Sequence, residues 1–257
     1  MGEPYSDYSS IRSCETSVPP IPIMPICIGC SESKLTMRKI LKKVPELSDS
    51  YNQTLSLYEI STSKSSYYGQ IKNNQKHGIG REIYKSGLTY YGEYTEDKQN
   101  GLGYLKIKKT KDWKEFFKGS FVNGSFYGYG EYYCDENYYK GQWQDDLKHG
   151  YGHEMVAGTD YKGHFLFGSK VGNGRMKGRS GDYKGEFLND KFVNGRFKDK
   201  RGRFVYSGSW QDGVWNGRGK IEFKSGSPIK SFSGDFIRGK FGAGILKFPD
   251  GREINSK

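Results

Sequence analysis

The feature of this chain that most constrains its fold is a glycine with an aromatic residue two positions before it and, in seven of eight copies, two positions after it. The glycines recur every 22 to 27 residues and are Gly69, Gly92, Gly119, Gly141, Gly163, Gly185, Gly208 and Gly234. A second motif, Gly-x-Gly, follows nine and eleven residues after most of them, as in HGYG at 149–152. A period of this length indicates a repeat architecture in which each unit packs on its neighbours.

Each repeat predicts a β-hairpin. In the first motif the aromatic residues and the glycine alternate with mostly polar residues, which is the period of a strand with one apolar face. After the Gly-x-Gly, apolar residues again take alternate positions, as in Leu105 and Ile107. An aromatic ring can lie over a glycine of the neighbouring strand, which has no Cβ to block it. The hairpins therefore predict one antiparallel meander whose stability comes from stacking neighbours.

These residues resemble the MORN-repeat family ("membrane occupation and recognition nexus"), and residues 139–152, YKGQWQDDLKHGYG, follow its consensus closely. The resemblance covers about residues 67–254 and implies an all-β fold: an elongated single-layer antiparallel meander of about eight hairpins over 67–257. MORN arrays occur in ciliary proteins, cytoskeletal scaffolds, junctophilins, lipid kinases and lysine methyltransferases. In the enzymes of the family catalysis lies in an added domain, and we expect none here, because the resemblance covers nearly three quarters of this chain.

Residues 1–66 differ from the array in composition and predict a mostly disordered or extended tail. They hold six of the eight prolines but only two of the 36 glycines. Within them, residues 33–44 place Leu35, Ile40, Leu41 and Val44 on one helical face with basic residues around it, which predicts a short basic helix that Pro45 ends. Such a segment docks more often on its own protein than on a membrane.

The net charge of +12 falls entirely on residues 67–257. Lysine precedes the anchor glycine in four consecutive repeats, which predicts a row on the polar face: Lys118, Lys140, Lys162 and Lys184. The row could meet acidic tubulin tails, another acidic protein or anionic lipid; alternatively it is a solvated face that keeps sheets from stacking. Nucleic acid is disfavoured, because the aromatic residues are expected on the opposite face.

The sequence offers no recognisable catalytic constellation, and we predict no catalytic residue, cofactor or metal. Cys27 and Cys30 could form half of a zinc or redox site, remain free thiols, or carry palmitate, and Gly2 fits the minimal myristoylation pattern. No apolar run is long enough to span a bilayer. We expect a non-catalytic scaffold of a ciliary or cytoskeletal assembly, cytoplasmic in location. The alternative is a peripheral membrane tether that uses the lysine row and acyl chains.

Overall fold

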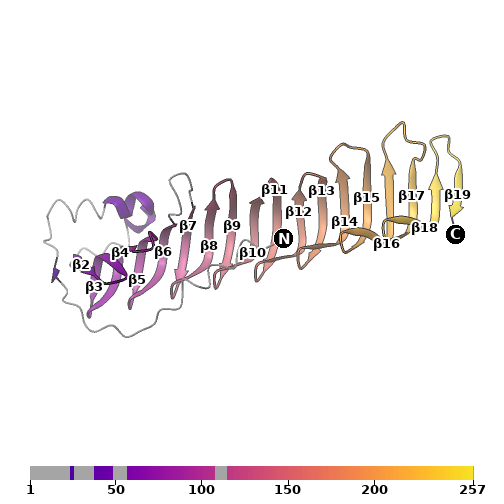
Figure 1. Cartoon of the computed structure of the whole chain (residues 1–257). Helices are drawn as coiled ribbons and strands as arrows, with labels where there is room; N and C mark the ends of the chain where they lie inside the picture. The colour runs from indigo at the N-terminus through magenta and orange to yellow at the C-terminus, as the bar shows by residue number, and fades with distance from the viewer. Residues whose placement is uncertain (1–23, 26–37, 49–56, 108–114, 257) are drawn as a thin grey trace.

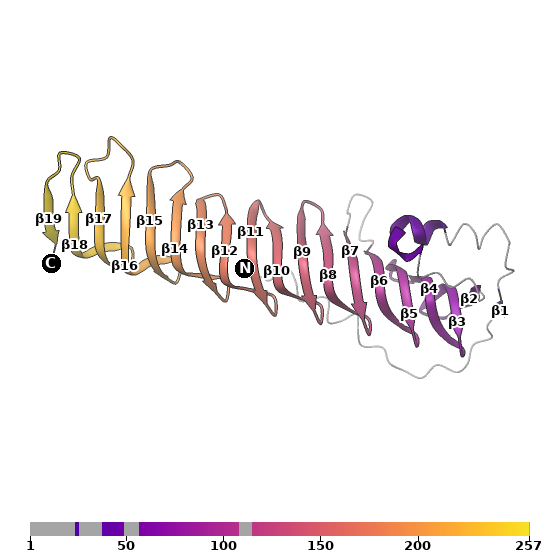
Figure 2. The same cartoon turned by 180° about the vertical axis from the view of Figure 1, so that it is seen from behind.

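The computed structural model describes residues 24–25, 38–48, 57–107 and 115–256. They form one elongated antiparallel sheet of 19 strands, in which each strand pairs with its neighbours in sequence (Figures 1 and 2). The expected single-layer meander is confirmed, with eight hairpins running from β3 to β18 and further strands at both ends.

The strands have the following bounds: β1 (Met24–Pro25), β2 (Leu57–Ser61), β3 (Ser65–Lys72), β4 (Gln75–Tyr84), β5 (Thr89–Thr95), β6 (Lys98–Ile107), β7 (Glu115–Val122), β8 (Ser125–Cys134), β9 (Asn137–Gln144), β10 (Leu147–Val156), β11 (Thr159–Leu166), β12 (Ser169–Lys177), β13 (Gly181–Leu188), β14 (Lys191–Asp199), β15 (Phe204–Gln211), β16 (Val214–Phe223), β17 (Ser231–Ile237), β18 (Lys240–Lys247) and β19 (Glu253–Ser256). Residues 38–43 are α-helical, and a 3₁₀ helix, η2 (Pro45–Ser48), follows them.

The two glycine motifs meet within each hairpin. In the fourth repeat Gly141 pairs with Gly152, whereas the next residue, Gln142, pairs with His149, so that two residues of β10 bulge out of the ladder of hydrogen bonds. Gly150, the first residue of this bulge, has a φ of 57°, a conformation that glycine adopts at little cost. The Gly-x-Gly motif therefore encodes a bulge as well as a contact between glycines.

The aromatic residue before each anchor lies over the glycine pair. A Cβ added to Gly163 would lie 2.6 Å from Cζ of Tyr161, and one added to the facing Gly174 would lie 2.7 Å from Cε2 of the same ring. The Tyr161 hydroxyl donates a hydrogen bond to the carbonyl oxygen of His164 at 3.1 Å. The glycines are thus required by space, because any larger residue would collide with a fully buried ring.

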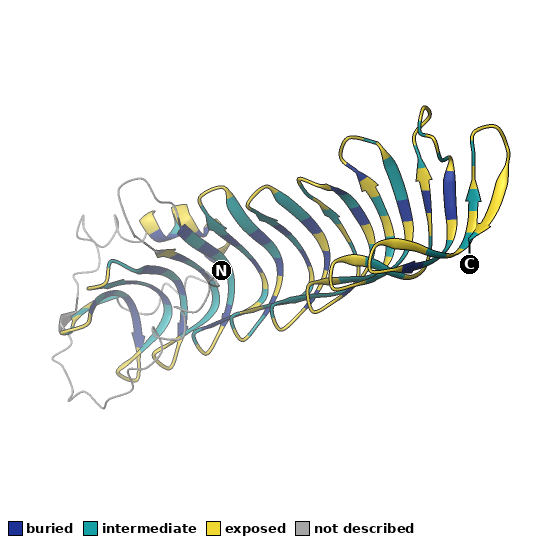
Figure 3. Ribbon diagram, turned by 45° about the vertical axis from the view of Figure 1, so that its right-hand side comes forward, coloured by how far each residue is buried: buried dark blue, intermediate teal, exposed yellow. Residues whose placement is uncertain are grey.

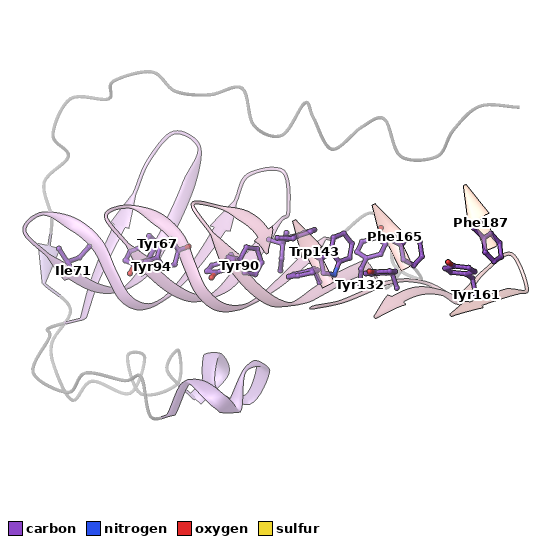
Figure 4. Packing of buried hydrophobic residues seen from close by; sticks show 14 of the residues in the cluster. Tyr67, Ile71, Tyr90, Tyr94, Tyr132, Trp143, Tyr161, Phe165 and Phe187 are labelled. Carbon is purple, nitrogen blue, oxygen red and sulfur yellow. The ribbon is translucent and has the colours of Figure 1, made fainter. Parts of the chain in front are cut away.

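The rings form a continuous ladder along the array (Figure 4). Within the fourth repeat Tyr139 and Trp143 are 5.0 Å apart at 86°, and Tyr139 meets Phe165 of the next repeat at 5.1 Å and 90°. Edge-to-face contacts of this geometry add to the stabilisation that burial provides. We call the side that carries these rings the ladder face.

A side chain from the second strand of the hairpin lies against the ring over the glycine pair, and its residue type varies between repeats. Seven residues after the anchor, Phe126 stacks on Phe117 at 3.7 Å, and Phe192 stacks on Tyr183 at 3.9 Å. In the first, fourth and fifth repeats a lysine takes this place, and the ammonium of Lys148 lies 5.5 Å from the Tyr139 ring centroid. These lysines form ion pairs with two buried glutamates: Lys76 with Glu82, and both Lys148 and Lys170 with Glu154.

The sheet begins before the boundary that composition placed at residue 66. Strand β2 starts at Leu57 and pairs with β3, in the register Tyr58 with Gly69. The described helical residues 38–43 fall within the segment predicted as a helix, 33–44. Together with η2 they pack against the sheet on the side opposite the ladder, which we call the helix face (Figure 4).

Candidate interaction surfaces

The centre of the helix face carries one row of side chains that crosses the whole array. It consists of the residue before each anchor glycine and its direct partners on the neighbouring strands. The predicted lysines all lie in it, separated by one residue each: Lys118 faces Glu131, which faces Lys140 on its other side. Strands lie about 4.8 Å apart, so successive lysines are about 10 Å apart, as the sequence predicted.

The first two lysines of the row are engaged. Lys118 Nζ lies 2.9 Å from Glu46 Oε1 of η2, and this hydrogen bond lowers the pKa of Glu46. Lys140 Nζ lies 3.4 Å from Glu131 Oε2 and 5.2 Å from the centroid of the Tyr133 ring. Both lysines are half-buried, and they stabilise the helix face itself.

The last two lysines belong to a continuous exposed array of cations. Lys162 on β11 pairs with Arg175 on β12, Arg175 pairs with Lys184 on β13, and Lys184 pairs with Arg196 on β14. All four are exposed. Within the described chain, Arg175 alone among them forms an ion pair, with Asp182 at 3.5 Å, and the charge of Arg196 contributes to the lowered pKa of Glu222. We call these four residues the basic strip.

Sequence reasoning missed the two arginines of the basic strip. They lie on the second strand of their hairpins, after the Gly-x-Gly position, whereas the search followed the residue before each anchor. The sequence did contain a signal for them. The anchor glycine pairs with the second glycine of Gly-x-Gly, so the residue before the anchor pairs with the residue after that second glycine, as Lys162 does with Arg175.

One expectation for this face is wrong. Aromatic residues were expected on the ladder face alone, but Tyr104, Phe116 and Tyr133 stack in succession on the helix face, with centroids 5.4 and 4.8 Å apart. Tyr138 and His153 extend this line by ring contacts. Phe116 and Tyr138 lie three residues before their anchor glycines. Tyr104, Tyr133 and His153 lie on second strands, where they face position −1 or −3 of a neighbouring strand. Because positions −3 and −1 are polar in most repeats, the period of the ladder gave no sign of this line.

The net charge is distributed unequally along the array. Residues 67–160 contain 13 Lys and Arg against 13 Asp and Glu, whereas residues 161–257 contain 21 against nine and therefore hold the whole excess. The basic strip lies in this second part. A charged surface of this kind attracts anionic partners and speeds their association at low ionic strength.

The tips of the hairpins are largely exposed (Figure 3). From the third repeat onward, each hairpin carries an exposed aliphatic residue near its tip. These residues expose between 40% and 62% of their surface: Val122, Leu147, Leu166, Leu188, Val214 and Ile237. The first two hairpins have polar residues at the tip, Lys72 and Gln75 in the first and Thr95 and Lys98 in the second. The apolar edge thus accompanies only the later repeats.

The comparison with protein families decides what this array is. A model of the MORN repeat matches residues 67–89, 90–107, 139–155, 161–182, 206–227 and 232–251. The chain belongs to the MORN-repeat family. A search of curated proteins found no match. The third and sixth MORN repeats, which the family model does not match, nevertheless form hairpins of the same kind, β7 with β8 and β13 with β14. The sixth lacks the first glycine of its Gly-x-Gly, whereas the third has both.

Other predicted features of this MORN protein lie outside the described residues. They are Gly2, Cys27 and Cys30. Among the residues that the structure does describe, no three His, Cys, Asp or Glu side chains gather in a way that could hold a metal ion. The same part of the chain has no helix long and apolar enough to cross a membrane.

Proposed function

We propose that this MORN array is a non-catalytic scaffold of a cytoplasmic cytoskeletal or ciliary assembly, and that its basic strip binds an acidic protein surface. MORN repeats are in general modules that interact with proteins or membranes. The observation that supports a polyanionic partner is the strip itself, in which four exposed cations lie on four adjacent strands. A carboxylate-rich segment such as a tubulin tail has the matching charge and an extended form that can follow the row.

Co-pelleting with microtubules tests this proposal. Lys184→Glu with Arg196→Glu reverses two charges of the strip, and we expect it to weaken binding at least tenfold, a change of about 1.4 kcal/mol. Lys224→Glu with Lys230→Glu is the matched control, because it gives the same net charge through two exposed residues between β16 and β17. Removal of the tubulin tails with subtilisin should abolish the difference between the two variants.

Equal binding by the strip variant and the control would contradict the proposal, because the contact would then depend on net charge alone. Binding that persists after the tails are removed would also contradict it. In cells, the scaffold should remain in a detergent-resistant cytoskeletal or ciliary fraction, and the strip variant should leave that fraction while the control remains.

A second candidate, a peripheral membrane tether, is favoured by one observation. The exposed Leu166, Leu188, Val214 and Ile237 follow the edge of the repeats that hold the positive charge. Lysines near an anionic membrane contribute about 1 kcal/mol each, and stable residence requires a second anchor, which acylation of Gly2, Cys27 or Cys30 would supply.

Fractionation separates the two candidates. Gly2→Ala with Cys27→Ser and Cys30→Ser should release a tether from a detergent-soluble membrane fraction, but should leave the scaffold in its pellet. Flotation with vesicles containing phosphatidylserine tests the direct contact. Flotation that needs Leu188 and Ile237, together with release of the acylation variant, would support the tether over the scaffold.

A further inference from the structure

The middle residue of each Gly-x-Gly points to the helix face, and its character divides the array. In the first four repeats it is apolar or aromatic: Ile79, Leu102, Tyr129 and Tyr151. In the next three it is polar, with Asn173, Asn194 and Arg218 at the corresponding places. An apolar row on the outer side of a single-layer sheet indicates that something covers it.

The first two repeats show what such a cover is. Ile40, Val44 and Leu47 of the 38–48 segment are at most 1% exposed, and they pack with Ile79, which is fully buried. Leu102 belongs to the same cluster. The hydrogen-bonded ion pair between Glu46 of the segment and Lys118 fixes its far end.

The spacing of this contact suits a helix on the sheet. The three apolar residues of the segment have the spacing i, i+4, i+7: Ile40 lies on the α-helical residues 38–43, Val44 follows them, and Leu47 lies on the 3₁₀ helix η2. The residues that the segment contacts run along the array, from Ile79 on β4 to Lys118 on β7. Successive repeats are two strands apart, which is about 9.6 Å, and seven residues of a continuous α-helix rise about 10.5 Å. A continuous helix that lies along the array therefore presents one heptad to each pair of strands.

In the third and fourth repeats the equivalent residues are uncovered by any described residue. Tyr129 is 60% exposed and Tyr151 is 57% exposed. Tyr127 and Leu147, both 44% exposed, border them on the same two hairpins. The row that the segment covers, with Ile79 fully buried and Leu102 partly buried, thus continues beyond it as an open aromatic surface.

We infer that the third and fourth repeats are a docking site for an amphipathic helix of a partner protein. The apolar residues of that helix, spaced i, i+4, i+7, pack on Tyr129 and Tyr151, and its acidic residues face Lys140 and Lys162. Two observations on the molecule determine this choice of occupant. The site continues an interface that already binds a helix, and the lysine row beside it already pairs with an acidic residue of that helix, Glu46 to Lys118.

The inference is tested with a peptide derived from the segment. The probe is a fluorescein-labelled peptide of residues 35–48 in which Arg38, Lys39, Lys42 and Lys43 are replaced by glutamate. Its binding to the full chain is measured by fluorescence anisotropy. Tyr129→Asp with Tyr151→Asp should weaken binding at least about tenfold, because aromatic residues at the centre of an interface dominate its affinity. Leu188→Asp with Ile237→Asp is the matched control, since these residues are equally exposed, at 60% and 62%, and lie in other repeats. The control should bind within about twofold of wild type.

A charge exchange tests the orientation of the helix. Lys140→Glu with Lys162→Glu should weaken binding of the acidic peptide and strengthen binding of the unmodified, basic peptide of residues 35–48. Neither residue is shared with the variant used for microtubule binding, so a failure here is distinguishable from a failure of the proposed function.

Several results would overturn the inference. The full chain could fail to bind the acidic peptide, or could bind it equally with and without the two tyrosines. A photo-crosslinking group on the peptide could react with β4 to β6, which would mean that the peptide displaces the chain's own segment. Light scattering could show a dimer that Tyr129→Asp with Tyr151→Asp converts to a monomer, in which case the occupant is a second copy of this chain. A circular dichroism melt that matches wild type ensures that each variant is folded.

Discussion

The first four and the last four repeats share one ladder face but differ on the helix face. On the ladder face the same arrangement of ring over glycine runs from Tyr67 to Phe232, and both residues are at most 1% exposed. On the helix face residues 38–48 cover the first two repeats, whereas no described residue from outside the array covers the last four. The sequence of the first four repeats is neutral in net charge, and that of the last four holds the whole excess of +12.

This difference shows how a single-layer sheet separates folding from recognition. The ladder face has little freedom, because each ring fills the space above two glycines and contacts the ring of the next repeat. The helix face has no such constraint, so its residues can change from apolar to aromatic to basic without any change of register. Substitutions on the two faces should therefore change the free energy of unfolding by different amounts. On the helix face the change should also differ in sign from one repeat to another.

The largest effect is expected for the ladder in both halves. Trp143 is 7% exposed, packs against Tyr139 and Phe126, and donates a hydrogen bond to the Gly130 carbonyl oxygen at 3.1 Å. Trp143→Ala should reduce the free energy of unfolding by about 4 kcal/mol, and Phe187→Ala in the sixth repeat by about 3 kcal/mol.

Urea and thermal unfolding measure these changes, and the exposed Tyr129→Ala is the control, with an expected change below about 0.5 kcal/mol. A large loss in one half and none in the other would break the claim that the ladder is uniform.

A somewhat smaller effect is expected when a glycine under a ring is filled. Gly163→Val would force the Tyr161 ring away from the glycine pair, at a cost of about 2 to 3 kcal/mol. Gly178→Val is the matched control, because a Cβ there meets no atom closer than 3.9 Å. Equal stability of the two variants in unfolding experiments would contradict the arrangement of ring over glycine.

The periodic part of this structure was predictable because glycine recurs at every place where a ring of the ladder needs room. The anchor glycines and their aromatic neighbours determined the hairpins, the meander and the side of the lysines. The covers of the ladder were not predictable in the same way, because a phenylalanine and a lysine fill the same position, as Phe126 and Lys148 do. For residues 38–48, docking on the protein itself was the expected outcome, but the place of docking was not predictable. Their amphipathic pattern indicated a helix, but nothing in one sequence says which sheet residues an apolar helix face will meet.

Acid should affect the first repeats more than the last. Thirteen residues after the anchor, Glu82 and Glu154 are buried in the first and fourth repeats, whereas Met176 and Ile221 take this place in the fifth and seventh. Burial alone would raise the pKa of Glu82, but the charge of Lys76 and hydrogen bonds from Lys76, Ser65 and Tyr84 lower it overall. A carboxylate with a lowered pKa stabilises the fold above its unfolded pKa, and this stabilisation is lost as pH falls through the folded value.

We therefore expect amide protection in β3 to β6 to fall as pH drops below about 4.3, the unfolded pKa of glutamate. The loss should be on the order of 1 kcal/mol for each unit by which the pKa is lowered. Hydrogen exchange at a series of pH values resolves this region from β15 to β18. There the effect should be smaller, because Glu222, whose pKa is lowered by a hydrogen bond from Lys220, is exposed. The Glu82→Gln protein should be less stable at neutral pH, and its amide protection in β3 to β6 should lack the acid-dependent loss. An unchanged profile in that variant would show that another group causes the acid sensitivity.

The smallest effect, and the sharpest comparison of the two halves, concerns two equivalent lysines. Lys118 faces Glu131 across the strands and lies 2.9 Å from Glu46, so Lys118→Glu places like charges together and should destabilise by about 0.5 kcal/mol. Lys184 lies between Arg175 and Arg196, so Lys184→Glu replaces two repulsions with two attractions and should stabilise by a similar amount, about 0.5 kcal/mol. Urea unfolding at low and high salt measures both, and salt should reduce each difference, since exposed charges are screened. Changes of the same sign would mean that the row does not act through these neighbours. Opposite signs would show that the last repeats retain a repulsion that costs stability, which is what a surface kept ready for an acidic partner would require.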